Sequence, residues 1–364
     1  LSNLLNIILK INRAIFFIAL FCFQISVAKD LDTFLWVQIE SLSNKESINN
    51  VIDFASQNGY SDLLVQVRSR DNAAYNSKIV SKPYYIDEEF DPLNYIINLA
   101  NKANIKIHAW INMYVIWSGK VKPRSSSHIL YQNDHWQDLP FYKNDLSFRN
   151  HYFSPLHPDV NSYLLTVIDE VIKNYKLDGV HLDYVRFKDK NYGNNNTGLK
   201  EFHKITGNRI QFNPQNNIEW EKFKIKNVSA LVQDAFILIK KKDDKIILSA
   251  AVKPNLLEAK NRFSQDWLTW LKKGFIDYVF PMNYYKEMEY FNRDLKLMVN
   301  RVPFPLQRKI VMGIGCYNQH AEDAVDKISL VKLYNFGGIS LFSFDNHIKD
   351  LSWFEPLHKK LFIN

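Results

Sequence analysis

The chain alternates strand-like and helix-like segments along most of its length, and this alternation constrains the fold more than any other feature. Helical patterns with end signals separate the strands: Ser43-x-x-Glu46 predicts a capping box, and Asp91-Pro92 predicts a helix start. Parallel strands need crossover helices of this kind. Eight apolar segments are typical of buried strands: Phe34–Glu40, Leu63–Arg68, Ile105–Asn112, Gly179–Arg186, Ile246–Val252, Tyr278–Tyr285, Lys309–Tyr317 and Gly338–Asn346.

Eight such units predict a closed (β/α)₈ TIM barrel. An open doubly wound sheet is the alternative, but no Gly-rich phosphate-binding turn follows the first strand. Two insertions are longer than a barrel loop requires, at residues 113–156 after the third strand and 187–245 after the fourth. The first is rich in aromatic residues, whose faces stack on sugar rings, so we expect a cleft wall there rather than a packing extension.

The N-terminus has the layout of a secretory signal peptide. Lys10 and Arg13 precede the apolar run Ala14–Phe23, and the small residues Ser26–Ala28 follow. The apolar run is short for a membrane span, although an uncleaved anchor is the alternative. The pattern predicts a signal peptide over residues 1–28 and an exported barrel domain over residues 29–364, periplasmic or extracellular. Cleavage of the signal peptide would leave Cys316 as the single cysteine, so no internal disulfide is expected.

The net charge of +8 is spread thinly along the chain. The longest basic run, Lys240–Lys242, is typical of a solvated helix end. A mild positive charge fits an anionic polymer partner such as cell-wall material, whereas nucleic-acid binding has little support.

The run Asp178–Phe187 (DGVHLDYVRF) carries the strongest functional signal. His181 and Asp183 are two residues apart, so both point to one side of an extended strand. A carboxylate and an imidazole at the end of a buried strand are costly unless they are paired or used. We expect Asp183 to be an ionised catalytic carboxylate, with Arg68 or Arg186 lowering its pKa.

Glycosidic-bond hydrolysis uses two carboxyl groups, one of which donates a proton to the leaving oxygen. We expect Glu287 to be this acid, because the sixth strand lies near the fourth across the barrel mouth. Glu40 and Asp345 are the alternatives.

Polar and aromatic residues near the other strand ends are typical of a sugar site. We expect the following residues to bind substrate: Arg68, Tyr75, His108, Trp110, Asn112, Tyr114, His181, Tyr184, Arg186, Asn283, Tyr285 and Asp345. A three-ligand metal site from His108, His181 and Asp183 is a weaker hypothesis, because their spacing differs from that of helical zinc motifs. No cofactor is expected, and no Gly-x-Ser-x-Gly nucleophile elbow is present.

Seven motifs together resemble the bacterial glycosyl-hydrolase-like family ten. They span about residues 34 to 346 in the order of that family: Gln66–Arg68, Ala74–Ser77, Asp91–Leu93, Ile107–Asn112, His157–Val160, Asp178–Tyr184 and Pro281–Tyr284. The resemblance implies an exported TIM barrel that acts on polysaccharide. By position, Asp183 is similar to the strand-four nucleophile of α-amylase-type barrels, with His181 in place of their Arg. The run also resembles a chitinase motif, but Val185 stands where that motif has its acidic Glu.

The leading hypothesis is therefore an exported glycoside hydrolase acting on a cell-envelope or extracellular polysaccharide, with Asp183 essential. Two alternatives are a non-catalytic carbohydrate-binding barrel and a metal-dependent polysaccharide deacetylase or hydrolase.

Overall fold

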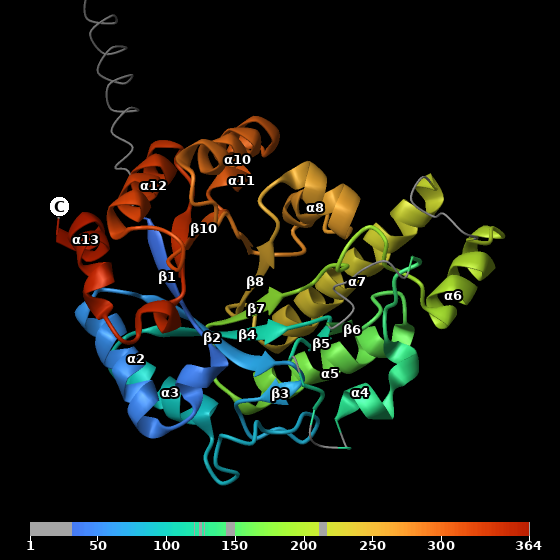
Figure 1. Ribbon diagram of the computed structural model, residues 1–364, viewed down its shortest axis with the longest axis horizontal. Coiled ribbons are helices and arrows are strands. Elements are labelled where there is room, and N and C mark those ends of the chain that lie inside the picture. Colours follow the sequence, from blue (N-terminus) through green and yellow to red (C-terminus); the bar gives the residue numbers. More distant parts are fainter. Residues whose placement is uncertain are drawn as a thin grey trace, which may run out of the picture. The chain divides into compact units, whose positions relative to one another are not determined.

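Parallel strands form the wall of a nearly closed barrel in the computed structural model (Figure 1), which describes residues 31–119, 121–123, 126, 128–142, 150–210 and 217–363. The predicted TIM-barrel fold is confirmed. A parallel bridge between Val279 and Ile310 links the two ends of the sheet. In spatial order the strands are β10 (Val311–Gly315), β11 (Gly338–Phe342), β1 (Asp32–Val37), β2 (Asp62–Ser69), β4 (Lys106–Asn112), β7 (Gly179–Asp183), β8 (Ile247–Val252) and β9 (Tyr278–Pro281).

Helices surround this wall and cover the outer faces of the strands (Figure 1). Asn44, rather than the predicted Ser43, caps the first of them by accepting a hydrogen bond from the N–H of Ser47. Asp91 caps the next one as expected. The helices are α2 (Lys45–Gln57), α3 (Pro92–Lys102), α5 (Pro158–Asn174), α7 (Ile218–Lys242), α8 (Leu256–Phe263), α9 (Trp267–Lys273), α10 (Met288–Arg301), α11 (Phe304–Gln307), α12 (Ala321–Leu333) and α13 (Glu355–His358).

Five strands end earlier than their apolar pattern suggested, at Val37, Asp183, Pro281, Gly315 and Phe342. Tyr184 adopts a φ of 53°, which breaks the extended conformation directly after β7. Pro281 has no N–H to donate to a sheet ladder. After Phe342 the chain turns into a 3₁₀ helix over Phe344–His347. Residues beyond these points therefore belong to loops.

The two predicted insertions follow β4 and β7. The first contains β5 (Val115–Trp117), α4 (Ile129–Gln132), a 3₁₀ turn (Asp134–Trp136) and β6 (His151–Tyr152). The second contains α6 (Asn196–Thr206), but α7, which lies within the predicted range, is the crossover helix of the barrel itself. A short strand β3 (Asn72–Ala73) pairs with the end of β2.

Aromatic residues of the first insertion pack against one another and against rings of the helices α5 and α7. The ring of Trp136 lies 5.5 Å from that of Tyr163 and 6.1 Å from that of Phe153. Phe141 packs edge-on against Trp220 of α7, with ring centres 6.2 Å apart. This segment is thus largely a packing extension, and the expected aromatic cleft wall is wrong.

Large side chains fill the barrel interior. Trp36, Trp110 and Phe280 belong to a cluster of buried residues inside it. The rings of Trp36 and Trp110 meet edge to face at 4.7 Å, a favourable aromatic geometry. Burial of each large apolar side chain stabilises the fold by roughly 1.5–3 kcal/mol. The barrel interior is therefore a packed core.

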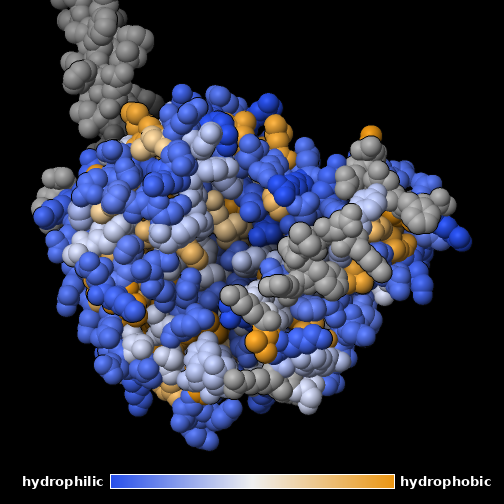
Figure 2. All heavy atoms as spheres, in the orientation of Figure 1, coloured by the Kyte–Doolittle hydropathy of each residue, from blue (hydrophilic) through white to orange (hydrophobic). Residues whose placement is uncertain are grey.

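The surface seen in the same orientation is largely hydrophilic, with hydrophobic residues in small separate patches (Figure 2). In the part of the chain that the structure describes, no helix has both the length and the apolar character to span a bilayer. The predicted signal peptide lies outside the described residues.

Candidate active site

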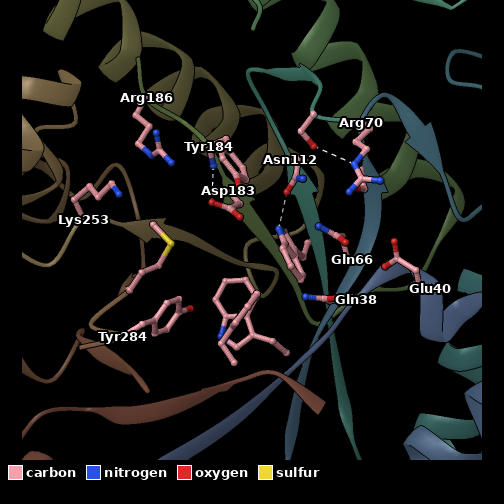
Figure 3. A pocket seen from close by; sticks show the side chains of 16 residues that line it. Gln38, Glu40, Gln66, Arg70, Asn112, Asp183, Tyr184, Arg186, Lys253 and Tyr284 are labelled. Atoms are coloured by element: carbon pink, nitrogen blue, oxygen red, sulfur yellow. Dashed lines mark hydrogen bonds between the residues drawn. The ribbon is translucent and has the colours of Figure 1, made fainter. Parts of the chain in front are cut away.

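A cavity of about 390 Å³ opens at the carboxyl ends of the barrel strands. Its size is that of a small-molecule or sugar-binding site. Most of the residues around it are polar or aromatic, and they come from loops and strand ends far apart in the chain (Figure 3). The lining residues are Trp36, Gln38, Glu40, Gln66, Ser69, Arg70, Trp110, Asn112, Ser118, Asp183, Tyr184, Arg186, Lys253, Met282, Tyr284 and Phe342.

Asp183 is the last residue of β7 and lies beside Asn112, the last residue of β4. Its side chain is 6% exposed and lines the cavity. The N–H of Tyr184 donates to its Oδ1 at 2.6 Å. This bond is possible because the φ of Tyr184 turns the chain at once after the strand.

Burial raises the pKa of Asp183 to about 6, although Arg186 and Lys253 act in the opposite direction. The desolvation of the carboxylate outweighs these charges and the Tyr184 N–H bond. The expectation of a lowered pKa is therefore wrong. A carboxyl group with a pKa near 6 is protonated in a large fraction of molecules at mildly acidic pH, and protonation suits a group that donates a proton.

Glu40 supplies a second carboxyl group to the cavity. It lies on a 3₁₀ turn, Ile39–Leu42, that follows β1, and its side chain is exposed. Figure 3 shows Glu40 and Arg70 on one side of the cavity and Asp183, Arg186 and Lys253 on the other. The two carboxyl groups therefore approach the space between them from different sides.

Amide side chains lie between these two groups. Gln38, Gln66 and Asn112 all line the cavity (Figure 3). Asn112 is held in place because Trp110 Nε1 donates to its Oδ1 at 2.9 Å. Gln66 Oε1 accepts from the N–H of Ile39 at 3.2 Å. Amides fixed in this way offer donors and acceptors of the kind that recognise sugar hydroxyls.

Five of the predicted site residues line the cavity: Trp110, Asn112, Asp183, Tyr184 and Arg186. Glu40, one of the alternative acids, also lines the cavity, and so does Lys253, which follows β8. The alternation of β1 and β2 could have identified Gln38 and Gln66. Arg70 and Ser118 lie on loops and gave no sequence signal.

Glu287, the predicted proton donor, is exposed and precedes α10 rather than lining the cavity. Met282 and Tyr284 still line the cavity after β9 ends at Pro281, but Glu287 lies beyond them at the start of α10. Tyr285 belongs to the same loop, where it packs against Tyr290 with ring centres 5.7 Å apart. Asn283 is buried and donates to the carbonyl of Phe291 at 3.1 Å.

Arg68 is fully buried and is not among the residues that line the cavity. Its Nη2 pairs with Asp71 Oδ1 at 2.5 Å, and its Nη1 donates to the carbonyl of Asn112. The register of β2 against β4 shifts between Gln66 and Arg68, so the two side chains do not share a face. The contacts of Arg68 are therefore structural ones, and the structure does not bring it to the cavity wall.

The two histidines of the barrel strands are buried below the cavity rather than in it. His108 Nε2 lies 2.9 Å from Asp62 Oδ1, near the start of β2. His181 Nδ1 lies 2.8 Å from Ser249 Oγ, and burial lowers the pKa of His181 well below its usual value, which favours the neutral ring. Neither residue lines the cavity, so neither is placed to bind substrate.

Tyr75, Tyr114 and Asp345 are also outside the cavity lining. Tyr75 is fully buried, and the hydroxyl of Tyr114 donates to Asn161 at 2.9 Å. Asp345 accepts from the N–H of Gln38 at 2.8 Å and from Ser41 at 2.5 Å. These contacts fix the turn that carries Glu40, so Asp345 acts on the site through that turn.

The hypothesis of a metal site from His108, His181 and Asp183 finds no geometric support. Among the described residues, no three His, Cys, Asp or Glu side chains converge closely enough to hold a metal ion. Cys316 is a free, buried thiol.

Comparison with known proteins gives relatives of one kind. The family model described as glycosyl hydrolase-like 10 matches residues 28–324. Glycosyl hydrolase YngK of Bacillus subtilis is 28% identical over 159 residues, which are 41% of this chain and 30% of that protein. Glycosyl hydrolase DigH of Escherichia coli is 22% identical over 269 residues, 66% of this chain and 58% of that protein. These matches cover less than two thirds of either relative.

Solved structures share the fold at low sequence identity. The glycoside hydrolase domain of PgaB (BpsB) from Bordetella bronchiseptica has a TM-score of 0.69 and 11% identity, covering 92% of this chain and 99% of that one. An alpha-L-fucosidase from Paenibacillus thiaminolyticus has a TM-score of 0.64 and 13% identity, covering 91% of this chain and 49% of that one. The fold is thus that of glycoside hydrolase barrels, and the family match over most of the sequence shows that this chain belongs to the glycosyl hydrolase-like 10 family.

Proposed function

We propose that this protein is a glycoside hydrolase that cleaves a cell-envelope or extracellular polysaccharide, with Asp183 as the proton donor and Glu40 as the second carboxylate. The observation that carries the proposal is the buried carboxyl group of Asp183, whose pKa is raised to about 6 at the wall of the cavity. Family membership and the glycoside hydrolase barrels of similar fold support this class of reaction.

The proposed roles of Asp183 and Glu40 follow from their different environments. Asp183 is buried, so its neutral form is favoured, and a neutral acid can protonate the leaving oxygen of a glycosidic bond. Glu40 lies at the exposed side, where a charged carboxylate keeps contact with water and can activate a water molecule or stabilise the oxocarbenium-like centre. Gln38, Gln66 and Asn112 are placed to orient the sugar between them.

A binding-only barrel was the main alternative because the strand ends offered no clear second carboxylate. The presence of Glu40 in the cavity lining weakens that alternative. We also propose that the protein is exported, which the basic and apolar pattern of residues 1–28 supports. N-terminal sequencing of protein purified from its native cells should begin at Lys29, and an intact residue 10 would contradict cleavage at that site.

The test of the reaction compares Asp183→Asn with Glu287→Gln. Release of reducing ends from purified envelope and extracellular polysaccharides should fall by roughly a hundredfold to ten-thousandfold in Asp183→Asn, because the proton donor is lost. Glu287→Gln, which removes an exposed carboxylate outside the cavity, should retain full activity. Circular dichroism checks that both variants are folded. A folded Asp183→Asn variant with unchanged activity would refute the proposal.

A further inference from the structure

Two cationic side chains stand together on the wall of the cavity beside Asp183. Arg186 follows β7 and Lys253 follows β8, and both line the cavity (Figure 3). They share one aromatic support: the guanidinium carbon of Arg186 lies 5.4 Å from the ring centre of Phe263, and Lys253 Nζ lies 4.8 Å from it. Arg186 also lies 5.0 Å from the ring centre of Tyr184.

Neither cation has a carboxylate partner within ion-pair distance among the residues that the structure describes. The guanidinium of Arg186 makes one long hydrogen bond, 3.4 Å from Nη1 to the carbonyl of Phe187, and its buried Nε has no partner in the described part of the chain. A buried donor without a partner is costly, and so are two like charges side by side. Burial and the nearby Arg186 lower the pKa of Lys253, which reflects that cost.

A third cation contacts the ring of Phe263 and, unlike the other two, has carboxylate partners. Arg262 lies 5.1 Å from the ring centre of Phe263, but it pairs with Asp189 at 2.7 Å and with Glu258 at 3.1 Å. Arg262 does not line the cavity. Arg186 and Lys253 thus differ from Arg262 in two respects: they face the substrate space, and they have no carboxylate partner among the described residues.

We infer that Arg186 and Lys253 form a subsite for a carboxylate carried by the sugar next to the scissile bond, so that the preferred substrate is an acidic glycan. The inference rests on the proposed function and adds the charge of the substrate to it. The planar guanidinium fork matches a carboxylate, and the ammonium of Lys253 adds a point charge. Aromatic support holds both groups in position, which reduces the entropy lost on binding.

The test measures binding and cleavage of matched acidic and neutral oligosaccharides. The acidic probes are hyaluronan and oligogalacturonate fragments, and their matched controls are the same fragments after reduction of the carboxyl groups to alcohols. Chitin oligosaccharides serve as a neutral probe, and their sulfated form tests a different anion. Wild-type protein should bind an acidic probe about tenfold or more tightly than its reduced form, as expected for a charge-assisted hydrogen bond.

Arg186→Gln and Lys253→Gln should each remove most of this preference, measured as the ratio of the affinities for an acidic probe and its reduced form. Arg262→Gln removes a cation from the same ring but outside the cavity, so it should retain the preference. An equal loss of the preference for acidic probes in Arg262→Gln would mean a general surface-charge effect and would overturn the inference. Equal binding of sulfated and carboxylated probes would overturn the carboxylate assignment.

Failure of the inference can be told apart from failure of the proposed function. Cleavage of chitin or another neutral oligosaccharide, with no preference for the acidic probes, would overturn the subsite and leave the hydrolase proposal standing. If folded wild-type protein neither binds nor cleaves any probe, the result would count against both the subsite and the hydrolase proposal.

Discussion

At the scale of single residues, the chemistry of the site depends on the environment of one carboxyl group. Asp183 is surrounded by groups that favour its charged form, including the Tyr184 N–H at 2.6 Å, yet burial still raises its pKa to about 6. The cavity therefore holds two carboxyl groups in unlike surroundings, which is how one site supplies both an acid and a base.

The pH dependence of kcat/KM should report the protonation of Asp183. If Asp183 donates a proton, its neutral form is the active one, so activity should fall as the pH rises through about 6. If activity instead falls as the pH drops through about 6, Asp183 works as a charged nucleophile. Rates measured from pH 4 to pH 8 on one polysaccharide substrate decide between these roles.

The role of Glu40 can be separated from that of Asp183 by changing the leaving group. Both Glu40→Gln and Asp183→Asn should lower cleavage of the natural polymer by roughly a hundredfold or more. A dinitrophenyl glycoside of the sugar that the wild type releases needs no protonation of its leaving group, so it should restore activity in Asp183→Asn but not in Glu40→Gln. Restored activity in Glu40→Gln alone would exchange the two roles.

At the scale of elements, the irregularities of the strands decide which side chains reach the cavity. The register shift between Gln66 and Arg68 places Gln66 at the cavity and Arg68 beneath it. Arg68 then joins the carbonyl of Asn112 at the end of β4 to Asp71 in the loop after β2. Tyr163 of α5 donates to the same Asp71 oxygen at 2.8 Å. Arg68 therefore holds three elements together below the substrate space.

Replacement of Arg68 by Met should destabilise the protein rather than alter substrate preference. The change leaves the carboxylate of Asp71, which is 5% exposed, without its partner, and breaking a buried ion pair costs about 3–5 kcal/mol. Urea unfolding measures the loss. The double variant Arg68→Met with Asp71→Asn should recover part of it, since no uncompensated charge remains. A loss under about 1 kcal/mol in the single variant would show that the pair is not structurally important.

The alternation of strands and helices allowed the barrel to be predicted, because parallel βαβ units leave few other folds. The site was predicted less well, and the errors lie where strands end. Glu287 and Tyr285 follow Tyr284, which still lines the cavity, and nothing local in the sequence shows where the chain leaves the cavity. A register shift such as that at Gln66 depends on contacts between β2 and β4, which are distant in sequence. Aromatic composition in the first insertion could not distinguish packing from sugar binding.

At the scale of the whole molecule, the closed barrel keeps Asp183 in a position that opposes folding at neutral pH. The carboxyl group has a pKa of about 6 in the folded chain and an ordinary value of 3.8. Because the folded pKa is the higher one, the folded state binds more protons between these two values, so stability falls as the pH rises from about 3.8 to 6. The shift corresponds to a cost on the order of 3 kcal/mol above pH 6.

Removal of this charge should therefore stabilise the protein while abolishing its activity. Asp183→Asn should raise the free energy of unfolding by about 1–3 kcal/mol at pH 7.5, and the gain should shrink at pH 5, where the wild-type carboxyl group is largely neutral. Glu287→Gln, which changes an exposed carboxylate, should show no comparable gain at either pH. Urea titrations at the two pH values give the comparison. A gain that does not depend on pH would trace the effect to packing or hydrogen bonding of the amide instead of to the buried charge, and the raised pKa, on which the proton-donor role rests, would lose its support.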